Sequence, residues 1–162
     1  MHVNQTVPGT EQDSVVDAVL SASRVLVAIA ARSLADAGEE VTLTQYRSLV
    51  VLASRGPQGM AALAEAVAVT APTASRLCDR LVKKGLVRRR TDRNDRRQVR
   101  IGLTEAGRQL IDTVSTRRRR EITDLLASIP PKTQRSVATA LVELAKSAGE
   151  VPEQAWSTGW DL

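Results

Sequence analysis

Several residue types are scarce in this chain, and each scarcity excludes a class of protein or site. Only 2% of its 162 residues are aromatic and none is Phe, so the core must be built from Leu, Val, Ile and Ala. A single Cys excludes an intrachain disulfide, and together with a single His it leaves too few ligands for a structural zinc site. No Cys–His dyad and no glycine-rich phosphate loop can be found. We therefore expect no metal, no cofactor and no enzymatic activity.

Long apolar runs are also missing. No uninterrupted apolar run approaches eighteen residues, and Met1-His2-Val3-Asn4-Gln5 begins no signal peptide, so we expect a cytoplasmic protein without a membrane segment. The contents of hydrophobic residues (43%) and charged residues (25%) are typical of one globular domain. A net charge of +5 and a pI near 10.1 indicate an anionic partner. A membrane surface competes with DNA for that role, but no long basic amphipathic helix favours it.

The chain is organised around residues 63–104, which read as a short helix, a tight turn, a second helix and a basic hairpin. The second helix begins at Thr70, whose hydroxyl is expected to cap the first turn, and Pro72 lies within that turn. Gly85 is free to adopt the left-handed conformation that ends a helix. The apolar face of this helix contains Ala74, Leu77, Cys78, Leu81 and Val82.

The hairpin completes a winged helix and carries much of the charge. Residues 86–90 and 98–103 read as strands, and residues 91–97 form a turn rich in Asp, Asn and Arg. Residues 71–100 contain eleven Lys and Arg against three Asp, a balance of +8, so the rest of the chain sums to −3. Positive charge concentrated in one module is typical of a DNA-binding surface.

In these motifs and their spacing the chain resembles the multiple-antibiotic-resistance regulator (MarR) family of bacterial transcription factors, over roughly residues 14–148. The resemblance implies a mostly α fold with a small β-hairpin wing, and a DNA-binding transcriptional regulator, usually a repressor. The matching pieces are Leu63-Ala64-Glu65, Ser75-Arg76-Leu77, Lys84-Gly85-Leu86-Val87, Asp92-Arg93-Asn94-Asp95-Arg96-Arg97 and Leu103-Thr104-Glu105-Ala106-Gly107.

The chain departs from the family pattern in two places. Ala68 stands where a glycine usually makes the turn between the two helices, which costs roughly 1 kcal/mol if that residue needs a positive φ. Gly59 or Met60 stands where the first of these helices usually has a Ser or Thr cap. The second departure puts one phosphate contact in doubt.

Short polar side chains flanked by cations are suited to reading base edges and holding phosphates. Arg97 is the candidate for the minor groove, with Asp95 holding its guanidinium extended; alternatively, that pair only rigidifies the tip of the hairpin. Arg93 and Arg96 are expected to contact phosphates. The predicted DNA-binding residues are Thr70, Pro72, Thr73, Ser75, Arg76, Arg80, Lys83, Arg93, Asp95, Arg96 and Arg97.

The predicted organisation is a disordered arm (1–12), one domain (13–148) and a C-terminal tail (149–162). Within the domain, the winged helix spans residues 42–103. Thr42 and Gln45 are expected to form a capping box at the start of a helix, and Thr104 is expected to cap the helix that follows the hairpin. Helices at 13–37, 104–129 and 131–148 carry apolar stripes that need a cover. Packing against a second copy would cover them, so we predict a homodimer that binds double-stranded DNA with half-sites about 34 Å apart. In the resembling family these helices form the dimer interface.

Three further features have competing interpretations. Cys78 lies on the apolar face of its helix, so we interpret it as a core residue and not as a redox sensor. The run Arg117-Arg118-Arg119-Arg120 covers most of a helix circumference and is interpreted as solvated or paired with Glu121, Asp124 or an N-terminal acid. Alternatively, one of these arginines receives an anionic small-molecule effector. The resembling family binds ligands between the dimerisation helices and the winged helix, which points to the first two helices and the start of the long one.

A second functional hypothesis is a winged-helix interaction module that binds a protein or coats DNA without sequence preference.

Overall fold

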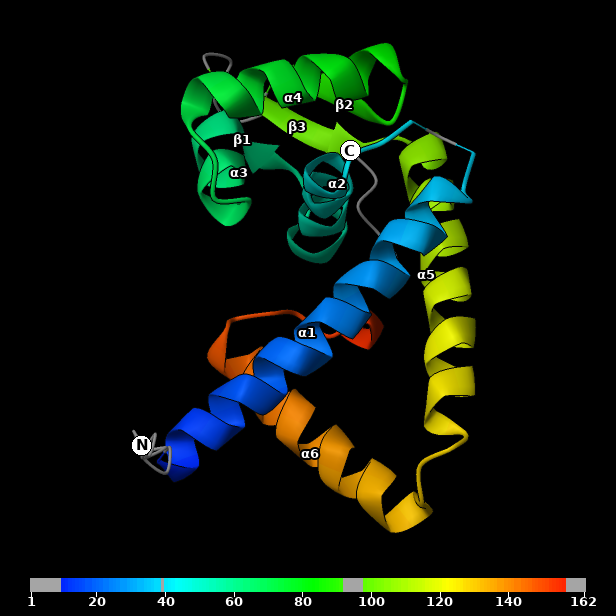
Figure 1. Ribbon diagram of the computed structural model, residues 1–162. Helices are drawn as coiled ribbons and strands as arrows, with labels where there is room; N and C mark the ends of the chain where they lie inside the picture. The colour runs from blue at the N-terminus through cyan, green and yellow to red at the C-terminus, as the bar shows by residue number, and fades with distance from the viewer. Residues whose placement is uncertain (1–9, 39, 92–97, 157–162) are drawn as a thin grey trace, which may run out of the picture.

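The computed structural model describes residues 10–38, 40–91 and 98–156, and it confirms a mostly helical fold with a small antiparallel sheet. The winged helix gathers at one end, and α5 leads away from it towards α6 at the other end (Figure 1). The elements are α1 (Glu11–Ala35), α2 (Leu43–Arg55), β1 (Gln58–Gly59), α3 (Met60–Ala66), α4 (Ala71–Lys83), β2 (Val87–Thr91), β3 (Val99–Leu103), α5 (Glu105–Leu126), α6 (Pro131–Ser147) and the 3₁₀ turn η1 (Glu153–Ala155).

Side-chain caps fix where three of the helices begin. The Thr42 hydroxyl accepts from the Gln45 N–H at 3.2 Å and the Gln45 side chain accepts from the Thr42 N–H, which is the predicted capping box. At α5 only the one-way cap is present: the Thr104 hydroxyl accepts from the Gly107 N–H at 3.1 Å. A further capping box joins Thr10 and Asp13, so α1 begins at Glu11. The predicted boundary of the N-terminal arm at residue 12 is therefore wrong, because this capping box starts the helix earlier.

The sheet has three strands in the order β1-β3-β2, all antiparallel. The hairpin pairs Val87 with Leu103 and Thr91 with Val99, as the basic hairpin predicted. Strand β1, which pairs Gln58 with Ile101, was not predicted because a two-residue strand has no alternating pattern. It ties the start of α3 to the hairpin.

The core of the winged helix is aliphatic, as the scarcity of aromatics predicted. Large side chains from four elements are at most 2% exposed: Leu49, Leu52, Leu63, Leu81 and Ile101. The long helix α5 joins this core through Leu110, Ile111 and Val114. Its first turn lies so close to the winged helix that a Cβ on Gly107 would be 2.2 Å from the Leu86 carbonyl oxygen. Gly107 therefore allows α5 to dock.

Outside this core the helices are exposed. In α1, only Ile29, Ser33 and Leu34 are buried, and no residue of α6 is buried by the part of the chain that the structure describes. Exposed apolar side chains of these two helices include Val16, Val19, Leu20, Leu141 and Leu144. The apolar stripes predicted to need a cover are thus open in α1 and α6, but the prediction is wrong for the first half of α5, because Leu110, Ile111 and Val114 are covered by the core of the winged helix.

Helix α1 is also long and apolar enough to cross a membrane, with a mean hydropathy of 1.8 over eighteen residues. The sequence analysis did not anticipate this, because Ser21 and Arg24 interrupt the apolar run in every such window. One helix of this kind is weak support for a membrane span, since core helices of soluble proteins and N-terminal signal sequences are equally long and apolar.

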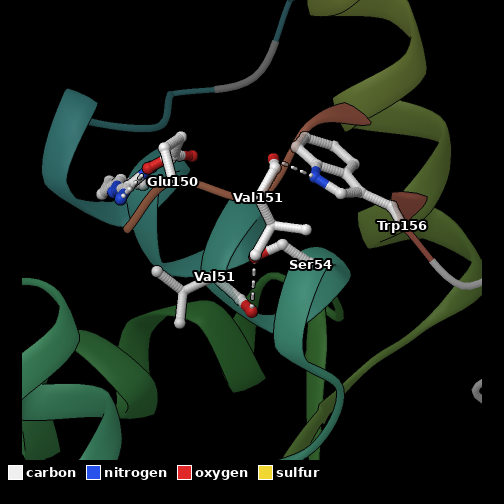
Figure 2. A network of polar contacts seen from close by, with 6 residues as sticks. Val51, Ser54, Glu150, Val151 and Trp156 are labelled. Carbon is white, nitrogen blue, oxygen red and sulfur yellow. Dashed lines mark hydrogen bonds and ion pairs between the residues drawn. The ribbon is translucent and has the colours of Figure 1, made fainter. Parts of the chain in front are cut away.

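The segment after α6 is the start of the predicted C-terminal tail (149–162), to which the sequence analysis assigned no structure. Here Glu150 contacts α2, Glu153 contacts α5, and Trp156 packs against the main core. The Trp156 indole N–H donates to the Val151 carbonyl at 2.9 Å (Figure 2). The contacts of Glu150 and Glu153 join distant parts of the chain, so no periodic pattern predicts them.

Candidate nucleic-acid interface

Helix α4 is held by its inner face and presents its outer face to solvent. Ala74, Leu77, Cys78 and Leu81 are buried, as predicted, while Val82 is 38% exposed and does not belong to the buried face. The helix ends as predicted, with Gly85 at φ +69° and the Leu86 N–H donating to the Leu81 carbonyl at 3.0 Å. The outer face therefore has a fixed orientation relative to the wing.

The turn between α3 and α4 contains Ala68, the first of the two departures from the family pattern. Ala68 has φ +54°, in the left-handed region that disfavours residues with a Cβ. The Val69 N–H donates to the Ala64 carbonyl at 3.0 Å, which closes the turn. Gly59 stands at the N-cap of α3 without a side-chain hydrogen bond, as the second departure predicted.

Thr70, Thr73 and Arg76 form a row along the exposed side of α4. The Thr70 hydroxyl donates to the Thr73 hydroxyl at 2.9 Å, and the Arg76 guanidinium lies 3.5 Å from the same oxygen. The prediction that the Thr70 hydroxyl caps the first turn is wrong, because this hydroxyl accepts no hydrogen bond from the backbone of α4 and instead donates to Thr73. The backbone N–H groups at the start of α4 thus receive no bond from the cap residue, and such N–H groups favour anions.

The other predicted residues of α4 extend the same surface. Pro72 is exposed in the first turn, Ser75 is half-buried, and Arg80 and Lys83 are exposed in the last turns. The structure therefore brings together every predicted site residue of this helix on or beside one face. The predicted wing residues Arg93, Asp95, Arg96 and Arg97 lie outside the described residues.

An ion pair that the sequence analysis missed joins α4 to the wing. The Arg89 guanidinium on β2 lies 2.6 Å from the Asp79 carboxylate on α4. Both side chains are about half exposed, so the pair contributes little to folding stability and acts mainly on orientation. The sequence analysis missed this contact because the two residues lie on different elements, and only the fold shows that Arg89 faces α4.

Cys78 has no exposed surface and lies within the main core. Burial raises the pKa of its thiol, opposed in part by the nearby Arg89. A neutral buried thiol is a poor nucleophile, which agrees with the interpretation of Cys78 as a core residue.

A second feature adjoins the winged helix, a cavity of about 850 Å³ between α2, α5 and the segment after α6. The cavity lies against the middle of α5, where Ser115, Arg118 and Arg119 line it, and not against the start of that helix as the family resemblance suggested. Burial raises the pKa of the Tyr46 phenol, and hydrogen bonds with Ser115 and Arg118 oppose that shift.

The arginine run of α5 lines this cavity in part, and its pairing corrects the sequence analysis. Arg119 pairs with Glu153 of the C-terminal segment, an acid that was not considered. Glu121, one of the predicted partners, pairs instead with Arg32 of α1 at 2.7 Å. The Nε atom of Arg118 is buried without a hydrogen-bond partner in the described residues.

Within the described ranges, no group of three or more His, Cys, Asp and Glu residues is arranged to hold a metal ion.

Comparisons with known proteins agree with this architecture. Residues 41–99 match the MarR family. A stretch of 75 residues is 36% identical to the HTH-type transcriptional repressor NicR of Pseudomonas putida, and it covers 46% of this chain and 48% of that repressor. The match thus spans about half the length of this curated relative.

Two solved structures share the fold over most of their length. RV1404 from Mycobacterium tuberculosis is 34% identical, with a TM-score of 0.82 over 90% of this chain and 99% of that one. BpsR from Bordetella bronchiseptica, whose DNA binding is regulated by 6-hydroxynicotinic acid, is 22% identical, with a TM-score of 0.63 over 86% of this chain and 98% of that one. The winged helix with its exposed α4, the matched family residues and the near-complete overlap with a relative of 34% identity lead to one conclusion: the chain belongs to the MarR family.

Proposed function

We propose that this protein is a homodimeric transcriptional repressor that binds a pseudo-palindromic operator and is released from it by an anionic small molecule. The observation that carries the proposal is the exposed row of Thr70, Thr73 and Arg76 at the start of α4. A hydroxyl pair and a guanidinium beside helix N–H groups that the Thr70 side chain does not cap can bind base edges and phosphates together.

The roles proposed for the individual residues follow from the chemistry of the major and minor grooves of DNA. Arg76 works in or beside the major groove, and Arg80 and Lys83 hold phosphates along the same helix. Arg97, braced by Asp95, enters the minor groove from the wing; Arg93 and Arg96 hold phosphates there. The minor groove distinguishes A·T from G·C poorly but responds to its width, so Arg97 supplies a preference for narrow A·T-rich flanks.

The dimer is proposed because the apolar faces of α1 and α6 are open in a single chain. A second copy covers them and places two α4 helices on one side of the assembly. Sedimentation of the full chain should give twice 17.5 kDa, about 35 kDa, at micromolar concentration. A monomer that still binds an operator tightly would contradict the dimer.

The effector site is proposed to be the cavity beside Tyr46. BpsR, which shares the fold, is regulated by an aromatic acid. The cavity here offers comparable chemistry, because Arg118 and the Tyr46 phenol meet on an otherwise partly apolar wall. Titration of the protein–operator complex with 6-hydroxynicotinate tests whether this cavity accepts such an acid.

The decisive experiment measures binding of the wild-type protein and two variants to a randomised operator library at two salt concentrations. Arg97→Ala should weaken binding and flatten the A·T preference at the outer flanks while leaving the half-site centres unchanged. Arg76→Ala should relax the half-site centres at a cost of about 1–3 kcal/mol if it contacts a base. If Arg76 touches only phosphate, all sequences weaken alike and the salt slope falls by about one.

The second candidate, a module that coats DNA without sequence preference, is favoured by the high positive charge of residues 71–100. A footprint separates the two candidates: a regulator protects one short inverted repeat, and a coating protein protects DNA of any sequence.

A further inference from the structure

We infer that the segment Glu150–Trp156, here called the strap, sets the charge selectivity of the cavity, so that it accepts a monoanionic aromatic acid and rejects dianions. This inference rests on the proposed function only in taking the cavity as the effector site. It assigns a role to a segment that the sequence analysis left without one.

The strap is attached to both walls of the cavity through its carboxylates. The Glu150 carboxylate accepts two hydrogen bonds from the Arg47 guanidinium of α2, at 2.9 and 2.7 Å. The Glu153 carboxylate pairs with Arg119 of α5. The Glu150–Arg47 pair has the bidentate geometry that makes arginine–carboxylate contacts strong and directional.

Glu150 is ionised in this arrangement. Hydrogen bonding from Arg47 lowers the pKa of the Glu150 carboxyl, and it raises the pKa of Arg47. At neutral pH the strap therefore cancels the positive charge of Arg47, and Glu153 does the same for Arg119 on the opposite wall.

The charge that remains in the cavity is small. Three arginines line it, Arg47, Arg118 and Arg119, against two glutamates, so the lining has a balance of +1. Arg118 is the arginine that no carboxylate of the described residues pairs with, and its buried Nε atom lacks a hydrogen-bond partner. One cation beside the Tyr46 phenol, without a carboxylate partner in the described residues, matches one carboxylate of a ligand. Without the two strap carboxylates the same lining has a balance of +3.

The strap also supplies an aromatic wall. The Trp156 indole is held by its hydrogen bond to the Val151 carbonyl, on the side of the strap away from the Glu150 carboxylate (Figure 2). Trp156 and Glu153 line both this cavity and a smaller one of about 300 Å³. With the strap in place, about 850 Å³ remains, which is within the range of small-molecule sites. The strap therefore forms a wall of the site and does not fill it.

The test compares two probes of similar shape, benzoate and isophthalate, which carry one and two carboxylates. Calorimetric titration of the full-length wild-type protein should show tighter binding of benzoate. In the double variant Glu150→Gln/Glu153→Gln the ratio of the two affinities should shift towards isophthalate by roughly tenfold or more, because two unpaired guanidinium groups now face the ligand. Arg118→Gln should abolish benzoate binding.

Glu143→Gln is the matched control, since Glu143 is exposed on α6 and pairs only with Lys146 in the described structure. It removes one acidic charge from the protein without touching the cavity, and should leave the ratio unchanged. Hydrogen exchange of residues 148–156 checks that the strap of the double variant stays seated. If the strap detaches in the double variant, a second variant, Trp156→Ala, serves as the comparison. It loosens the strap but keeps both glutamates, so it should shift the ratio of the two affinities less than the double variant does.

An unchanged ratio in the double variant would overturn the inference. So would the absence of binding of either acid to every variant, because the cavity would then not be an anion site. Sequence-specific operator binding is measured without any ligand, so it can succeed or fail independently of this result.

Discussion

Leu81 in α4 and Leu141 in α6 are the same residue type, each in a well-formed helix, but their surroundings are opposite. Leu81 has no exposed surface and contacts the core of the winged helix, whereas Leu141 is 46% exposed. The same contrast holds between α2, with seven buried residues, and α6, with none in the described structure. The winged helix completes its core within one chain, and the terminal helices do not.

The comparison teaches that the two regions obtain their stability from different sources. Burial of apolar side chains stabilises the winged helix independently of protein concentration. The faces of α1 and α6 can gain the same kind of stabilisation only from another molecule, so their contribution depends on concentration. The predictions below separate these two sources.

The largest effect is expected from Leu81→Ala. Removing a fully buried leucine leaves a cavity and should lower the free energy of unfolding by about 2–5 kcal/mol. Leu141→Ala should instead weaken self-association and leave the winged helix stable. Urea denaturation at two protein concentrations measures both effects. The loss of stability caused by Leu141→Ala should shrink as the protein concentration rises, and the loss caused by Leu81→Ala should not. Equal concentration dependence for the two variants would contradict the distinction.

Gly107→Ala should be the next most damaging change. The new Cβ would meet the Leu86 carbonyl oxygen at 2.2 Å, and neither atom can rotate away, because the oxygen belongs to the backbone and the backbone of residue 107 fixes the position of the Cβ. We expect a loss of about 1–3 kcal/mol, because α5 must shift from the winged helix. The matched control is Gly59→Ala, where the added Cβ has no atom within 4 Å. Thermal unfolding of the two variants makes the comparison.

Ala68→Gly should act in the opposite direction. Ala68 has φ +54°, and glycine relieves that strain, while greater freedom in the unfolded chain removes part of the gain. We expect a net gain of up to about 1 kcal/mol in the free energy of unfolding, with unchanged operator affinity. A loss of stability would show that the turn holds Ala68 without strain.

Cys78 should give the smallest effect on function. Burial raises the pKa of its thiol above the ordinary value, so the group stays neutral at pH 7 and becomes reactive only at higher pH. Iodoacetamide should modify the thiol of the native protein far more slowly than that of the urea-unfolded protein, and peroxide should leave operator affinity unchanged. Reversible loss of affinity on oxidation, abolished in Cys78→Ser, would identify a redox sensor.

The sequence predicted best where local chemistry decides the structure. The capping box at Thr42, the cap at Thr104, the left-handed Gly85 and the buried face of α4 all follow from residues within one helical turn of each other. Side-chain contacts across the fold were less accessible. The Thr70 hydroxyl turns to the Thr73 side chain and not to the backbone of its own helix, and the partners of Arg89 and Arg119 come from other elements.

The candidate site divides in the same way. The residues of α4 were found because helical spacing places them on one face, and the structure has them there. The strap was missed because its anchors are two glutamates bound to α2 and α5 and one tryptophan packed against the core, in a segment with no period.

The near absence of aromatic residues has an optical consequence. The single Tyr of the chain, Tyr46, and one of its two Trp residues, Trp156, line the same cavity. In a Trp160→Phe background, all near-ultraviolet emission would come from Tyr46 and Trp156. Energy transfer from the phenol to the indole would then report the distance between α2 and the strap. The protein therefore contains its own fluorescent gauge of that cavity, without any added label.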